Sequence, residues 1–170
     1  MAFRKKGVKV TPELLNDVLW DVKEKFFSSD APEYLKKQLR RINPNFHIVR
    51  HRKWDIVAQA WMVGRFARKD VAKKCLKLKQ SVHPVVTLDG DVYFPIIQIN
   101  KGAFQGITRR GLFYVLAHEL AHLLQIVNDE EVDGTYSYSS DADHDKRWLR
   151  LTLWMGGRGT EYIEHDQIWC

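Results

Sequence analysis

The sequence predicts an α+β fold in which helices pack on a small, mainly antiparallel sheet. Three observations lead to this prediction. Apolar residues recur at helical spacing near the start of the chain and again in its last third, the stretches between them include runs rich in β-branched residues, and no repeat or Gly/Ser/Pro-rich linker divides the chain. A length of 170 residues suits one hydrophobic core. We therefore predict a single domain over residues 1–170.

The first helix is predicted to begin after Thr11, which can cap it, with Pro12 at its first position. Its apolar residues then fall on one face: Leu14, Leu15, Val18, Leu19, Val22 and Phe26. A second, short helix is predicted from Pro32 to Ile42. Residues 46–50 alternate like a strand. The stretch 54–78 fits either a strand followed by a helix or one long helix, and both alternatives stay open.

A hairpin is predicted from residues 84–88 and 92–100, because both are rich in β-branched residues and the turn Asp89-Gly90-Asp91 separates them. Pro95 favours an edge strand or a bulge, since proline cannot donate to the ladder. A long helix is predicted over Arg109 to Val127, where apolar residues recur every three or four positions.

The middle of this long helix contains the motif His118-Glu119-Leu120-Ala121-His122. Four residues advance an α-helix by about 400°, so the two imidazoles project side by side and can share one metal ion. Glu119 points to the flank, where it would take a proton from a metal-bound water. A pair of surface histidines is the alternative, and it fits poorly because these polar groups interrupt an otherwise apolar helix.

A catalytic zinc needs a third protein ligand and an open position for water. The downstream candidates are His144, His165, Glu130, Glu131, Glu161 and Glu164. Residues 139–143 are good helix caps, and the helix that follows is predicted to place His144 in its first turn and to end at Gly156-Gly157. Its predicted core face is Trp148, Leu151 and Met155. We choose His144 as third ligand. His165 is the second choice, with a substrate-side role as its alternative.

Charge divides the chain unevenly. Residues 1–110 hold 23 Lys+Arg against 10 Asp+Glu and residues 111–170 hold 4 against 11, so the two segments carry +13 and −7. The basic segment, residues 1–110, can bind phosphates, although an ordinary solvated surface is the alternative. The candidate nucleic-acid contacts are Arg50, Arg52, Lys53, Arg68, Lys69, Lys73 and Lys74.

Together these motifs resemble the SprT-like zinc proteases, which include bacterial SprT proteins and the eukaryotic crosslink protease Spartan. The resemblance is carried by four segments: Ile97-Gln-Ile-Asn100 with Phe104, Ala117–His122, His144-Asp-Lys-Arg-Trp148 and Gly157–His165. They span about residues 85–166, which we take as the catalytic segment of the domain, overlapping the end of the basic segment.

The resemblance implies a zincin-like active-site helix, one Zn²⁺ held by His118, His122 and His144, and Glu119 as general base. It also implies cleavage of DNA-bound or DNA-crosslinked proteins. Asp145 departs from the family's usual glycine, and no cysteine-rich zinc ribbon follows, so DNA contacts must come from the basic segment. Further candidates for substrate contacts are Tyr136, Tyr138 and Tyr162.

Three rival functions stay open. An ImmA/IrrE-like peptidase acting on a transcription regulator would use a carboxylate ligand, and a nucleic-acid-binding module would hold zinc only structurally. A neutral peptidase would lack a polyanion partner. No apolar run of about 18 residues is present and the first residues lack a secretory pattern. We therefore expect an intracellular monomer, cytoplasmic or at the nucleoid or nucleus, that is neither secreted nor membrane-bound.

Overall fold

The computed structural model describes residues 7–50, 58–63, 85–86, 92–100, 107–133 and 144–158. Helix α1 spans Pro12–Phe27, and the Thr11 hydroxyl accepts the backbone N–H of Leu14 at 3.2 Å, as expected of a cap. Its buried apolar residues are Leu15, Val18, Leu19, Val22 and Phe26. The predicted first helix is confirmed.

Helix α2 spans Glu33–Arg41 and ends where Ile42 adopts an extended conformation. Its C-terminal end is held by Lys23 of α1, whose ammonium donates to the Ile42 carbonyl and, at 2.9 Å, to Oδ1 of Asn43. Lys23 is only 4% exposed, and this burial lowers its pKa to about 8. A buried cation thus ties the two helices together at a helix end where carbonyls lack intrahelical partners.

The strands form a mixed arrangement around one central strand. They are β1 (Asn45–Val49), β2 (Ala58–Val63), β3 (Val85–Val86) and β4 (Val92–Asn100). Strand β4 pairs antiparallel with β2 and β3 and parallel with β1. The predicted pairing of β3 with β4 is therefore confirmed, while the parallel β1–β4 pair adds a long connection that local alternation does not reveal. Of the stretch 54–78, only β2 lies within the described residues.

Pro95 lies in central β4, not in an edge strand. It faces Met62 of β2, but the pairing with β1 covers only Ile96–Asn100 and the pairing with β3 ends at Tyr93. A residue without an N–H is tolerated here because Pro95 falls between these two paired segments.

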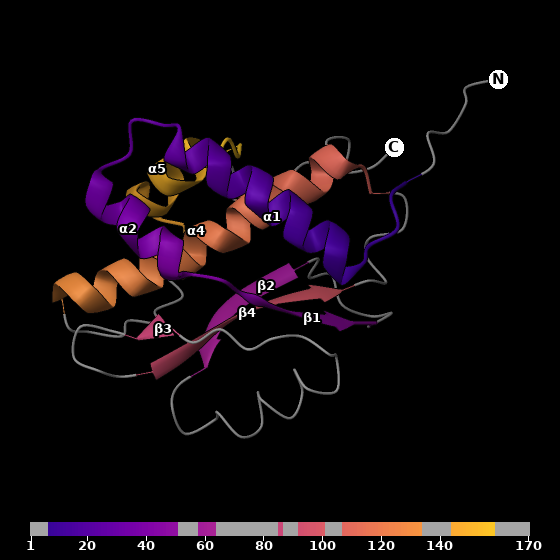
Figure 1. Cartoon of the computed structure of the whole chain (residues 1–170), viewed down its shortest axis with the longest axis horizontal. Coiled ribbons are helices and arrows are strands. Elements are labelled where there is room, and N and C mark those ends of the chain that lie inside the picture. Colours follow the sequence, from indigo (N-terminus) through magenta and orange to yellow (C-terminus); the bar gives the residue numbers. More distant parts are fainter. Residues whose placement is uncertain are drawn as a thin grey trace.

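Helix α4 spans Arg109–Asp133 and is the element around which the others pack. It extends six residues beyond the predicted end at Val127, into a polar stretch of the sequence. It contacts α1, α2, α5 and strands β2 and β4. In Figure 1 it passes over the strands, with the other described helices on the same side. The α+β class is confirmed.

Helix α5 spans Lys146–Trp154 and begins later than predicted. Its cap is Asp145, so His144 lies just before the helix and not in its first turn. Gly156 ends the helix with a φ of +77°, a conformation that favours glycine. The predicted core face is confirmed, because Trp148, Leu151 and Met155 are buried. No helix within the described residues is both long and apolar enough to cross a bilayer.

Candidate metal centre

Three imidazoles converge beside α4. Nε2 of His118 lies 3.2 Å from Nε2 of His122 and 3.2 Å from Nε2 of His144. The three candidate ligand atoms all lie within 4.8 Å of one another. A tetrahedral ion with bonds of about 2.05 Å sets its ligand atoms roughly 3.3 Å apart. The measured spacing therefore fits a group of nitrogens that can bind a single metal ion.

Local helix geometry explains the first two positions, because His118 and His122 are four residues apart on α4. Trp148 of α5 then packs against all three imidazoles, with ring centroids 4.7, 5.5 and 4.5 Å from those of His118, His122 and His144. Its Nε1 donates to the His118 carbonyl at 3.4 Å, and only 1% of the residue is exposed. The histidines therefore rest on a rigid indole that limits their movement.

His144 is positioned through its neighbour Asp145. The Asp145 carboxylate accepts the backbone N–H groups of Arg147 and Trp148 at 2.8 and 2.9 Å, which caps α5. It also accepts Nε2 of Gln125 from α4 at 3.3 Å. Burial alone would raise the pKa of Asp145, but the hydrogen bonds from Trp148 and Arg147 outweigh it and lower that pKa.

A second connection between the same helices runs through Arg147. Its guanidinium donates to the buried Asp129 of α4 at 2.7 Å and to Asp145 at 3.0 Å. One arginine therefore bridges a carboxylate on α4 and the carboxylate next to His144. Because Gln125 and Asp129 follow His122 by three and seven residues, they continue the same side of the helix.

Burial keeps the α4 histidines neutral. Together with the smaller effect of the neighbouring imidazoles, it lowers the pKa of His118 to about 4 and that of His122 to about 3. Neutral imidazole is the form that binds a metal. At neutral pH both side chains are therefore ready to ligate without first losing a proton.

Glu119 directly follows His118 on α4. It is 6% exposed, and its carboxylate accepts a hydrogen bond from the backbone of Ala60 in β2. Burial raises the pKa of Glu119 to about 8, although the hydrogen bond from Ala60 opposes this shift. A carboxyl group that exchanges protons near neutral pH is suited to general acid–base chemistry.

No family model, curated protein or solved structure matches this chain. The interpretation of the site therefore rests on its own residues and geometry.

The structure brings together His118, His122 and His144, the three ligands chosen from the sequence. Arg50, a candidate nucleic-acid contact, is exposed directly after β1. The remaining candidates lie outside the described residues: Arg52, Lys53, Arg68, Lys69, Lys73, Lys74, Tyr136, Tyr138, Tyr162 and His165, as do the alternative ligands Glu161 and Glu164. The alternative ligands Glu130 and Glu131 fall within α4, without described side chains.

Two residues of this centre, Gln125 and Asp129, are not identified from the sequence. Arg147 and Trp148 belong to the segment 144–148 that carries the family resemblance, but no role at the site is predicted for either of them, and Trp148 is otherwise predicted as a core residue. Gln125 and Asp129 could have been suspected from their spacing, because they are polar residues three and seven positions after His122 on a helix that is otherwise mostly buried. The sequence alone does not show that Arg147 of α5 is the partner of Asp129, because this contact depends on how α5 packs against α4.

Proposed function

We propose that this chain is a zinc-dependent endopeptidase of the SprT-like type, with one Zn²⁺ per chain bound by His118, His122 and His144. The observation that carries the proposal is the convergence of three imidazoles, in which Nε2 of His118 lies 3.2 Å from Nε2 of His122 and of His144 and all three ligand atoms lie within 4.8 Å. The buried Glu119 directly follows His118 in the chain. Three histidines with a free fourth position are typical of hydrolytic zinc, whereas structural zinc sites are closed by a fourth protein ligand.

When bound, zinc supplies a Lewis acid that polarises a peptide carbonyl and lowers the pKa of a coordinated water. Glu119 would accept the proton of the attacking water and donate it to the departing amine, which a carboxyl group with a raised pKa can do. Trp148 and the Asp145–Arg147 contacts would keep the three imidazoles in place during this transfer.

For the substrate, we propose proteins bound or crosslinked to DNA. This follows from the resemblance of the motifs to the SprT-like family and from the charge of +13 on residues 1–110. DNA would act as scaffold for the protease without being read in sequence. The enzyme would work as a monomer inside the cell, in the cytoplasm or beside the nucleoid or nuclear DNA.

The test combines elemental analysis with a protease assay on a DNA-bound protein. We expect about one zinc per chain in the wild type and in Glu119→Gln, and loss of zinc in His144→Ala. Glu119→Gln should also lose at least about a hundredfold in turnover, since general base catalysis contributes that much. Glu33→Gln, on exposed α2, is the matched control and should behave as wild type.

Two results would contradict the proposal. Zinc retained in His144→Ala would exclude this histidine as the third ligand and favour a carboxylate ligand. Full activity in Glu119→Gln would mean that zinc has a structural role and that the chain is not a peptidase of this type.

A further inference from the structure

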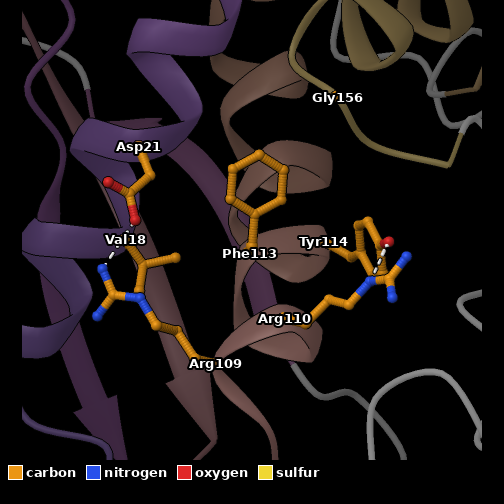
Figure 2. A pocket seen from close by; sticks show the side chains of 7 residues that line it. All are labelled: Val18, Asp21, Arg109, Arg110, Phe113, Tyr114 and Gly156. Carbon is orange, nitrogen blue, oxygen red and sulfur yellow. Dashed lines mark hydrogen bonds and ion pairs between the residues drawn. The ribbon is translucent and has the colours of Figure 1, made fainter.

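A pocket of about 500 Å³ lies between α1 and the N-terminal part of α4, and none of the three histidines is among its lining residues. Its lining includes Val18 and Asp21 from α1 and Arg109, Arg110, Phe113 and Tyr114 from α4. Figure 2 shows the ring of Phe113 standing between the Asp21–Arg109 pair on one side and the Arg110–Tyr114 pair on the other. Tyr114 precedes His118 by four residues, which is a rise of about 6 Å along the helix.

The pocket carries more positive than negative charge. Arg109 is paired with Asp21 at 2.7 Å, and both side chains are about half exposed. Arg110 and Arg158 have no carboxylate partner among the described residues. Arg158 is not a lining residue, but its guanidinium carbon lies 5.0 Å from the ring centroid of Tyr114, which lines the pocket. Counting Arg158, the described residues at the pocket and next to it hold three guanidinium groups against one carboxylate, a net charge of +2.

Tyr114 fixes the position of the two arginines without a carboxylate partner. Its hydroxyl accepts Nε of Arg110 at 2.8 Å, and the guanidinium carbons of Arg110 and Arg158 lie 5.6 and 5.0 Å from its ring centroid. Burial would raise the pKa of Tyr114, but the hydrogen bonds and charges of the two arginines outweigh it and lower that pKa. Arg110 uses Nε for this bond, and its terminal nitrogens, which have no hydrogen-bond partner within the described part of the chain, can donate to a ligand.

We propose that this pocket binds the phosphate group of a small organic phosphate. A net charge of +2 matches a phosphate dianion, and guanidinium groups match its geometry through paired hydrogen bonds. Val18 and Phe113 supply an apolar wall for the organic part of the ligand. The volume lies within the range of small-molecule sites, which favours a small ligand over a nucleic-acid backbone spread along the surface.

The proposal is tested by isothermal titration of the full chain with adenosine 5′-monophosphate, inorganic phosphate and adenosine at fixed ionic strength. We expect saturable binding of the monophosphate, weaker binding of inorganic phosphate and none of adenosine. Arg110→Gln and Arg158→Gln should each weaken binding roughly tenfold, because each removes a charge-assisted contact. The control Arg40→Gln removes an arginine of α2 outside the pocket and should leave binding unchanged.

Tyr114→Phe keeps the ring but removes the hydroxyl that orients Arg110, so binding should weaken severalfold while the fold is retained. Equal binding by the wild type and the Arg110→Gln, Arg158→Gln double variant would overturn the proposal. So would binding of a single-stranded oligonucleotide without binding of either phosphate. Glu119→Gln should bind the monophosphate like the wild type, so this test is independent of peptidase activity.

Discussion

Replacing Asp145 by alanine should weaken zinc binding without touching a metal ligand. The change removes the cap of α5, worth about 1 kcal/mol, and the hydrogen bond from Gln125, worth about 1 kcal/mol. The ion pair with Arg147 adds little, because the side chains of Arg147 and Asp145 are 53% and 29% exposed. The total is about 2 kcal/mol.

This free energy keeps His144 beside His118 and His122, since Asp145 directly follows His144. If the whole of this ~2 kcal/mol serves to hold His144 in its metal-binding position, the affinity for zinc should fall about 30-fold in Asp145→Ala, because 1.4 kcal/mol corresponds to a factor of ten. The assay is zinc competition against a chromophoric chelator, with urea unfolding of the metal-free protein measured in parallel.

Two matched variants separate the contributions. Asp145→Asn keeps a good capping side chain but loses the charge, so its zinc affinity should fall less than about fivefold. Glu33→Ala removes an exposed ion pair with Arg40 on α2 and should leave zinc binding unchanged. If Asp145→Ala lost about 2 kcal/mol of stability yet bound zinc within about twofold of wild type, Asp145 would support the fold without positioning His144.

Two further predictions concern the fold. The folded pKa of Lys23, about 8, is lower than the unfolded value of 10.5, so the unfolded chain binds more protons between these pH values. The free energy of unfolding of the wild type relative to that of Lys23→Met should therefore rise by about 2 kcal/mol from pH 8 to pH 10 in urea titrations. If the two proteins instead showed the same dependence of unfolding free energy on pH, the burial of the Lys23 ammonium would be contradicted. Gly157→Ala should lose about 1–3 kcal/mol, because a Cβ there would lie 2.6 Å from Cγ2 of Thr152. Thr152→Ser should relieve some of this loss, and an unchanged urea midpoint in Gly157→Ala would refute the close approach.

The helices are predictable because their signals are local. Thr11 and Pro12 mark the start of α1, and apolar spacing marks both α1 and α4. The predicted end of α4 is wrong, because the polar residues after Val127 are as compatible with a continuing helix as with a loop. The predicted start of α5 is also misplaced, because residues 139–143 and Asp145 are equally good caps by residue type.

The sheet is only partly predictable. The pairing of β3 with β4 follows from two β-rich runs separated by a short turn. The parallel pairing of β1 with β4 joins residues about fifty positions apart, as in Asn45 opposite Ile96. Period-two alternation identifies a strand but not its partner, so this contact cannot be derived from the sequence.

The sequence by itself determined that α4 carries two neighbouring imidazoles that can bind one metal ion. Residues four apart on a helix must lie side by side, so His118 and His122 follow from spacing alone. Tertiary structure decided which distant side chains join them. Nε2 of His144, 26 residues from His118, reaches it because α5 packs on α4 through Trp148 and the Arg147 contacts. Likewise Arg109 meets Asp21, 88 residues away, only because α1 packs on α4. Local geometry is set by neighbouring residues in the chain, whereas these contacts depend on how apolar helix faces are buried together.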